Sequence, residues 1–286
     1  MTTLLFLFVL GAALLHASWN ALVKVSADRF LGIAIIVFFA GLIATLGLFW
    51  VGLPTLSSLP WLILSAVLHT AYCLFLSRSY TTGDLGQVYP IARGCAPLIT
   101  ALLSWLILRE MLPPLAMLGV GLIIVGIMLI AFPQGKKSWQ LDRKTLLAAI
   151  TTSVFTAGYT LADGAGSRTS EEPLTYILWL FAINGWVMGA LMYYKYWHRA
   201  GRALCQYWQQ GLLGGLMQLL SYGIVIWAMS HAPIVLVAAL RETSVLFAML
   251  LSVVVLREPF SKLRLLACVV IVAGVIGTRL GSFTGA

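Results

Sequence analysis

Three charged residues, Arg93, Arg241 and Glu242, lie deep inside long apolar stretches of this sequence. A charge at the centre of a membrane-spanning helix costs roughly 2.5–3.5 kcal/mol on insertion scales, so it needs an opposite charge or a wet cavity. The planar guanidinium of arginine offers five N–H donors that suit carboxylate, phosphate or phosphonate oxygens. Two interpretations follow. Either Arg93 and Arg241 bind an anionic or zwitterionic ligand, or Arg93 and Glu242 form a structural ion pair.

Aromatic and polar residues recur at helical spacing in the same stretches. His16, Trp19 and Asn20 share one helix face, and Tyr159 and Asp163 share another. Such faces point toward other helices or a cavity, because polar groups facing lipid are costly. The alternative for a buried histidine is a neutral imidazole bonded to a neighbouring helix, and for Asp163 it is a place at the membrane interface.

The candidate ligand contacts are the charged, polar and aromatic residues near the middle of these stretches. We predict contacts from Arg93, Arg241, Glu242, Trp19, Asn20, His69, Tyr89, Tyr159, Tyr222 and Trp227. Glu242 and Asp163 are also candidates to carry a proton, since a partly buried carboxylate can exchange one near neutral pH. A permanent arginine partner would keep Glu242 ionised and remove that role. Asn184 and Gln218 are expected to point inward, to hold helices together or to touch a ligand.

The composition excludes a soluble domain. Charged residues are 9% of the chain, against roughly 25% in soluble domains, and 61% of the residues are hydrophobic. The net charge of +9 indicates basic cytoplasmic loops and anionic lipid headgroups as partners. No basic stripe with interleaved aromatics is present, so we predict no nucleic-acid partner. The four cysteines (Cys73, Cys95, Cys205 and Cys268) have no metal-type spacing, so neither a metal nor a cofactor is predicted.

Ten apolar segments are long enough to cross a bilayer, which takes roughly 20 residues each. They cover residues 3–23, 30–51, 60–80, 85–107, 114–132, 144–164, 173–195, 207–230, 233–256 and 260–280. The first lacks a basic leading region and a convincing cleavage site, so we interpret it as a spanning helix and not a signal peptide. The predicted fold class is all-α integral membrane, with ten transmembrane helices.

An internal repeat divides the chain into two sets of five helices. Arg93 recurs 148 residues later as Arg241, and Gly126 recurs as Gly274. The predicted repeats are residues 1–135 and 136–286. Because five is odd, the second repeat must enter the membrane in the opposite orientation, as a five-plus-five inverted repeat.

Loop charges predict the orientation of the chain. Thirteen Lys and Arg residues fall on one side of the predicted bundle, and only Arg109, Arg168 and Arg279 fall on the other. Since cytoplasmic loops are the basic ones, both termini are predicted outside the cytoplasm.

The repeated motifs resemble the EamA branch of the drug/metabolite transporter superfamily. The first copy runs Tyr89-Pro90-Ile91-Ala92-Arg93-Gly94-Cys95-Ala96-Pro97 through Leu108-Arg109-Glu110, and the second runs Arg241-Glu242 through Leu256-Arg257-Glu258 to Gly274. The opening from His16 to Lys24 is also similar to a branch associated with phosphonate utilisation. The Arg-Glu pairs at the helix ends are expected to cap and pair loops.

The resemblance implies a secondary transporter in the bacterial inner (plasma) membrane that works by alternating access. It implies a small organic substrate such as an amino acid, carboxylate or organophosphorus compound, with membrane lipid around a monomer or homodimer. The related sugar-phosphate translocators use basic residues on the corresponding helices, which favours Arg93 and Arg241 as substrate contacts. Many family members have cytoplasmic termini, however, which is opposite to the loop-charge prediction.

Other functions compete with this interpretation. An exporter of neutral aromatic or cationic compounds would use the aromatic residues in place of the arginines. An intramembrane enzyme would need a nucleophile–base pair or a metal constellation, and the sequence has no HExxH, DxxD or GxSxG motif. A non-transporting scaffold would be expected to carry an appended domain. We therefore predict a transporter and no enzyme activity.

Overall fold

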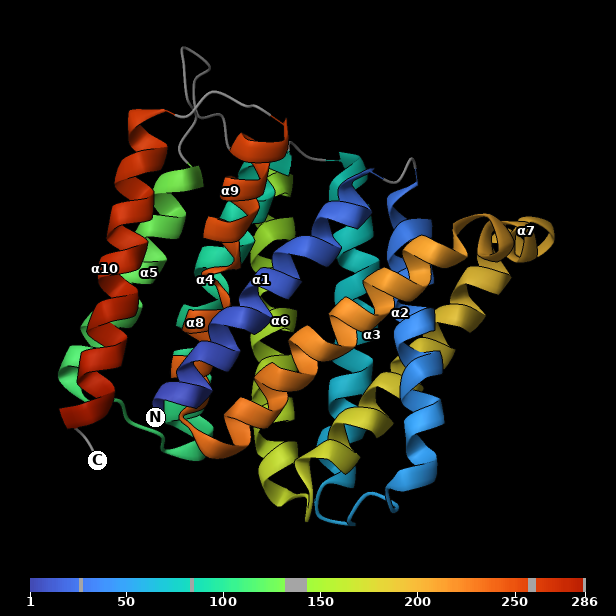
Figure 1. The fold of residues 1–286 in the computed structure, drawn as a ribbon, viewed down its shortest axis with the longest axis horizontal. Coiled ribbons are helices and arrows are strands. Elements are labelled where there is room, and N and C mark those ends of the chain that lie inside the picture. Colours follow the sequence, from blue (N-terminus) through green and yellow to red (C-terminus); the bar gives the residue numbers. More distant parts are fainter. Residues whose placement is uncertain (26–27, 83–84, 132–142, 257–260, 285–286) are drawn as a thin grey trace.

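The helices of the protein follow the apolar segments of the sequence. The computed structural model describes residues 1–25, 28–82, 85–131, 143–256 and 261–284, and within these residues it contains helices and no strand (Figure 1). The predicted all-α fold class is confirmed. The elements are α1 Thr3–Val25, α2 Arg29–Gly47, η1 Leu48–Trp50, α3 Leu59–Thr82, α4 Leu85–Leu108, α5 Pro114–Ala131, α6 Arg143–Thr169, α7 Pro173–His231, α8 Ile234–Arg241, α9 Ser244–Leu256 and α10 Lys262–Thr284.

Helix α7 is two long arms joined by a short helical connection. Its backbone leaves helical geometry at Trp197 (φ 19°, ψ −83°) and at Tyr207 (φ −113°, ψ 17°). Residues 173–196 form the first arm and residues 208–231 the second, and the chain folds back between them (Figure 1). The arms correspond to the predicted helices 173–195 and 207–230.

The single helix predicted over residues 233–256 is wrong, because the helix is interrupted at Glu242. Helix α8 ends at Arg241 and α9 begins at Ser244. The backbone tightens between them, with the Thr243 N–H donating to the Leu240 carbonyl at 3.1 Å. The Thr243 hydroxyl donates to that same carbonyl at 2.6 Å, so the side chain competes for an acceptor of the regular helix. Interrupted helices at mid-depth are typical of transporter binding sites.

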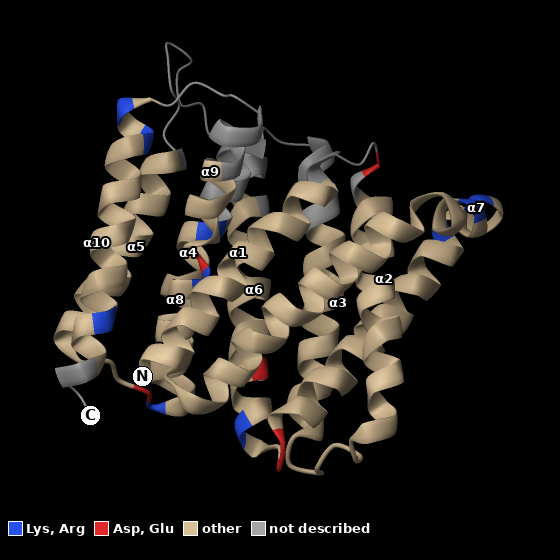
Figure 2. Cartoon of the chain, viewed as in Figure 1, with Lys and Arg blue, Asp and Glu red and all other residues tan. Residues whose placement is uncertain are grey.

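The outer surface of the bundle is apolar. In α10, Leu265, Val269, Val272 and Ile276 lie on one face and are each about half exposed, which suits contact with lipid. Charged residues gather near the two ends of the helices and are sparse between them (Figure 2). Among the described residues, four segments are long and apolar enough to cross a membrane: Thr3–Val23, Phe30–Trp50, Pro173–His231 and Lys262–Ser282. The protein is a multi-pass membrane protein.

Packing of α5 against α10 shows that the repeats are inverted. The two backbones approach so closely that a Cβ on Gly119 would clash with Gly274, and a Cβ on Gly126 would meet Ala267. These contacts run in opposite directions along the two helices, so α5 and α10 are antiparallel. The repeat relates Gly119 to Ala267 and Gly126 to Gly274, so corresponding helices of the two halves face each other in opposite orientation.

Both termini lie at one end of the bundle (Figure 1). The Arg279 guanidinium donates to the Met1 carbonyl and to the Thr3 hydroxyl, which ties α10 to the start of α1. We call this end the termini side. The opposite end, where Asp28 lies between α1 and α2, is the α1–α2 side.

Candidate functional site

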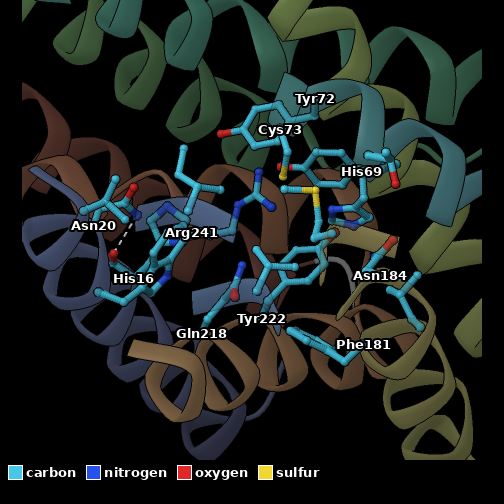
Figure 3. Close-up of a pocket in the computed structure, with 18 residues that line it drawn as sticks. His16, Asn20, His69, Tyr72, Cys73, Phe181, Asn184, Gln218, Tyr222 and Arg241 are labelled. Atoms are coloured by element: carbon cyan, nitrogen blue, oxygen red, sulfur yellow. Dashed lines mark hydrogen bonds between the residues drawn. The ribbon is translucent and has the colours of Figure 1, made fainter. Parts of the chain in front are cut away.

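A cavity of about 70 Å³ lies between the helices. Its walls come from α1, α2, α3, α6, both arms of α7 and α8 (Figure 3). The lining residues are His16, Trp19, Asn20, Val23, Ile33, Val37, His69, Thr70, Tyr72, Cys73, Tyr159, Leu180, Phe181, Asn184, Met188, Gln218, Tyr222 and Arg241. In α1 and α2 these residues belong to the halves nearer the α1–α2 side, and in α3 they lie at the middle of the helix. The cavity therefore extends from the middle of the bundle toward that side.

The cavity wall carries buried polar atoms without hydrogen-bond partners. Among the described residues these include Trp19 Nε1, Arg241 Nε, Asn184 Oδ1 and Gln218 Oε1. The first two are N–H donors, and an amide can present oxygen or nitrogen by turning over. A buried polar group without a partner costs free energy, so these atoms are expected to bond to water or to a ligand in the cavity.

Two arginines share one carboxylate beside the cavity. Arg93 Nη1 lies 2.9 Å and 3.1 Å from the two oxygens of Glu242, and Arg241 Nη2 lies 3.2 Å from Oε1. Glu242 is fully buried and both arginines are nearly so. This ion pair is the structural alternative that the sequence offered for Arg93 and Glu242. The cluster keeps one net positive charge, and its member that lines the cavity is Arg241.

The interruption between α8 and α9 positions this cluster. It places Arg241 at the last residue of α8 and Glu242 at its C-cap, while Arg93 approaches from α4. The His16 Nε2 atom is hydrogen-bonded to Arg93 Nη2, so α1 also contributes to the cluster. Helices α1 and α4 of the first repeat and α8 of the second thus meet at buried charges.

A second polar cluster surrounds the Asp163 carboxylate on α6, which is fully buried. One oxygen accepts hydrogen bonds from the hydroxyls of Ser65 and Tyr176, the latter at 3.1 Å. The other oxygen lies 2.6 Å from the Tyr222 hydroxyl and 3.1 Å from His69 Nε2. Four donors from α3 and α7 therefore hold one negative charge behind the cavity wall.

Aromatic rings connect the two clusters. His69 stacks on Tyr159 with ring centroids 3.9 Å apart and planes at 20°. Tyr222 meets both rings edge-on, at 5.3 Å from His69 and 5.8 Å from Tyr159. The Arg241 guanidinium lies over the Tyr222 ring at 5.6 Å, a distance suited to a cation–π interaction. The positive and negative ends of the cavity are thus joined through Tyr222.

The structure brings most of the predicted contact residues to one place. Six of them line the cavity: Trp19, Asn20, His69, Tyr159, Tyr222 and Arg241. Arg93 and Glu242 lie in the ion-paired cluster behind Arg241.

Trp227 is a predicted contact that lies away from the cavity. Trp227 packs against Phe8 at 6.0 Å and His231 at 4.9 Å and does not line it. The side chain of Tyr89 lies outside the described residues, as do Arg257 and Glu258.

Several lining residues were not among the predicted contacts. Leu180, Phe181, Asn184 and Met188 line the cavity from the first arm of α7. Counted from Leu180, the other three follow after one, four and eight residues, so all four lie on one face of the helix. Asn184 was expected to point inward, which identifies this face as the inner one. Gln218 lines the cavity from the second arm, also in its expected inward position.

A helical membrane bundle of two inverted repeats around a polar cavity belongs to the class of secondary transporters. The EamA-like transporter family matches the chain twice, over residues 3–132 and 143–280. The chain belongs to this family, which is part of the drug/metabolite transporter superfamily. No curated protein matches the sequence. A solved structure titled "Crystal structure of protein" is 18% identical, with 97% of this chain and 96% of that chain covered and a TM-score of 0.72, and it shows the same fold.

Proposed function

We propose that this transporter carries a small anionic or zwitterionic metabolite across the bacterial inner membrane by alternating access. The observation that carries the proposal is Arg241, which lines the cavity and belongs to a cluster with one positive charge in excess. Its buried Nε lacks a partner among the described residues. A substrate carboxylate, phosphate or phosphonate would bond to this N–H and balance the excess charge.

The rest of the cavity suits a zwitterion. Trp19 offers a second N–H donor, and Asn184 and Gln218 offer amide oxygens to an ammonium group. The buried carboxylate of Asp163 balances a positive group from the opposite end of the wall. An α-amino acid has this charge pattern, and a purely anionic substrate uses only the Arg241 end.

The aromatic wall supports a second candidate, a cationic or neutral aromatic substrate. Trp19, Tyr159 and Tyr222 could stack on such a compound. A cation at the Tyr222 face would, however, be repelled by the Arg241 guanidinium that already lies over that ring. The charge distribution therefore favours the anionic or zwitterionic substrate.

Alternating access needs the termini side to open when the α1–α2 side closes. Several contacts hold the termini side together. Arg168 lies 2.9 Å from Glu110 and donates to the carbonyls of Met229 and Ala232 at 2.8 Å. Glu110 also accepts from the Ile234 amide at 2.9 Å, so it caps the start of α8. We infer that these contacts separate when the substrate leaves on the termini side.

A matched series of ligands tests the charge preference. L-Phenylalanine, phenylacetate and phenethylamine share an aromatic ring and differ in charge, and thermal unfolding of purified protein in detergent reports their binding. A ligand at about 100 times its dissociation constant stabilises by about 2.7 kcal/mol. We expect stabilisation by the first two, lost in Arg241→Met and kept in Arg199→Met, which removes an exposed arginine. Glu242 keeps Arg93 as a partner in Arg241→Met, so this variant is expected to fold.

The same series contains the result that would contradict the proposal. Stabilisation by phenethylamine alone would assign the cavity to cations. After either outcome, a wider series would identify the substrate. It would include amino acids, carboxylates, phosphate esters, phosphonates and quaternary amines.

A further inference from the structure

Two histidines line the cavity in opposite electrostatic surroundings. His16 Nε2 is hydrogen-bonded to Arg93 Nη2. Because a guanidinium only donates hydrogen bonds, this nitrogen must accept and carries no proton. A proton on His16 would also lie next to the positive Arg93. His16 is therefore the neutral histidine of the cavity.

His69 faces a carboxylate instead. Its Nε2 lies 3.1 Å from Asp163 Oδ2, and the carboxylate also accepts from the hydroxyls of Ser65, Tyr176 and Tyr222. Since this carboxylate only accepts, Nε2 is the nitrogen that carries the hydrogen, and Nδ1 is the one left to gain a second proton. The ring stacks on Tyr159 at 3.9 Å, which holds it in place beside the carboxylate.

We propose that His69 is a proton-binding site and that a proton on it strengthens the binding of an anion in the cavity. The anion rests on the proposed function, but the proton site does not. The side chain of His69 is 17% exposed and lines the cavity, so water can reach it. The titratable and charged groups around it are Asp163 and Tyr159 on α6, Tyr222 on α7, Tyr72 and Cys73 on α3, and Arg241 beyond Tyr222.

The two carboxylates considered from the sequence are less suited to carry the proton. Glu242 contacts two arginines, and Asp163 accepts from three hydroxyls and one imidazole. Each of these contacts is a hydrogen bond that the carboxylate accepts, so the oxygens of both groups are already occupied. Histidine is also the side chain that ordinarily changes charge between pH 5 and 8. We therefore assign the proton to His69, with Asp163 as its counter-ion.

The charges at the cavity wall explain why a proton on His69 would strengthen anion binding. Arg93 and Arg241 balance Glu242 and Asp163, so these four described side chains sum to zero while His69 is neutral. A zwitterion adds no net charge to that arrangement. A proton on His69 gives the wall one net positive charge, which an anion cancels. By thermodynamic linkage, the bound anion must strengthen proton binding by the same factor.

Benzenesulfonate is the probe, because it stays anionic at every pH used. Its affinity would be measured calorimetrically at about pH 5.5 and about pH 7.5, the range in which histidine titrates. For wild type and for His198→Gln, an exposed histidine outside the cavity, we expect binding on the order of tenfold tighter at the lower pH. His69→Gln should bind with one affinity at both values. Equal affinity in wild type, or an unchanged pH effect in His69→Gln, would overturn the proposal.

A ligand-free measurement separates this proposal from the proposed function. The chain has four histidines, so ¹⁵N-histidine NMR spectra can be assigned with single His→Gln variants. The His69 signal should shift with pH between 5 and 8, while the His16 signal stays fixed. If benzenesulfonate binds nowhere but His69 titrates, the anionic substrate class is wrong and the proton site stands. A His69 signal that stays fixed over this range refutes the proton site.

Discussion

Glu242 is the residue on which the buried charges of this protein depend. Its carboxylate is fully buried and contacts Arg93 and Arg241 from two different helices. Desolvating two arginines near the middle of a membrane is costly, and the shared carboxylate offsets that cost. Without it, two positive charges would remain buried side by side. The cluster therefore holds α4 against the α8–α9 turn as well as shaping the cavity.

Replacing Glu242 should be strongly destabilising. We expect Glu242→Gln to lower the free energy of unfolding by about 3–5 kcal/mol, because it removes the carboxylate that both buried arginines contact. Thermal unfolding in detergent measures the effect. Adding Arg93→Met should recover part of the loss, since it removes one of the two neighbouring buried positive charges. A Glu242→Gln protein as stable as wild type would show that the ion pairs do not support the fold.

The sequence predicted many of the residues at the cavity, but it did not predict all of the contacts between them. Depth within apolar stretches identified Arg93, Arg241 and Glu242, and the Arg93–Glu242 pair was one of two interpretations. The contact between His69 and Asp163 joins residues 94 positions apart. Helical periodicity places each residue on a face but does not say which two faces meet, so this contact needed the structure.

At the scale of elements, close packing between corresponding helices of the two repeats depends on glycines at their contacts. Gly41 on α2 and Gly185 on the first arm of α7 approach backbone to backbone. Like α5 and α10, these two helices correspond in the repeat, and they run antiparallel. Small residues at such interfaces let helices approach closely when both are surrounded by lipid.

A methyl group at this contact should separate the helices. A Cβ on Gly41 would overlap Gly185, whereas a Cβ on Gly121 would have no described atom within 4 Å. We expect Gly41→Ala to destabilise by about 1–3 kcal/mol through overpacking, and Gly121→Ala to be neutral or slightly stabilising through helix propensity. Unfolding temperatures of the two variants provide the comparison. Equal effects would exclude the glycine contact as a determinant of packing.

The start of α2 should respond to acid. Asp28 caps α2 by accepting from the Leu31 amide at 3.0 Å, and it accepts from Tyr196 of α7. Burial alone would raise the pKa of Asp28, but the hydrogen bonds from Tyr196 and Leu31 and the nearby Lys195 lower it overall. A lowered folded-state pKa adds stability above the usual pKa of aspartate, about 3.9, and this stability is lost as pH falls through the folded value.

Because the pKa of Asp28 is lowered in the folded state, wild type and an Asp28→Asn variant should respond differently to acid. Wild type should lose stability relative to Asp28→Asn as the pH is lowered below about 4. Unfolding measured over a pH series in detergent shows whether the two curves converge. A constant difference between them at all pH values would mean that the Asp28 charge does not contribute.

Element boundaries were largely predictable, and the exceptions have local causes. The two arms of α7 were predicted as separate helices because charged and aromatic residues interrupt the apolar pattern near Trp197. The interruption at Glu242 was missed because residues 233–256 are continuously apolar apart from the residues at the break. There the Thr243 hydroxyl bonds the Leu240 carbonyl, a local competition that hydrophobic periodicity does not reveal.

At the scale of the whole molecule, charge is distributed unequally between the two ends. Lys195 lies at the end of the first arm of α7, and Arg199 and Arg202 lie in its connection. Figure 2 shows basic residues there and at the start of α10, opposite the termini. On the termini side, Arg168 and Arg279 are engaged with Glu110 and with backbone carbonyls. The basic α1–α2 side is therefore the side expected to face the cytoplasm.

The orientation can be tested with reporters fused to the C-terminus. Termini outside the cytoplasm predict that alkaline phosphatase, which folds only outside, is active there and that a fluorescent protein requiring the cytoplasm is dark. Fusions within the α7 connection, after Arg199, should give the opposite pattern. A fluorescent C-terminal fusion would reverse the orientation and make the cavity open away from the cytoplasm.

The central claim, that Arg241 binds the charged group of a transported substrate, is tested most directly by exchange in proteoliposomes. Vesicles preloaded with the unlabelled phenyl compound that stabilises the protein most would be given the same compound labelled outside. We expect accumulation that depends on the preload in wild type and Arg199→Met, and about a tenfold or greater loss in Arg241→Met, since a bond to a charged group contributes about 1.5–3 kcal/mol. Exchange that is undiminished in Arg241→Met, or confined to phenethylamine, would contradict the account.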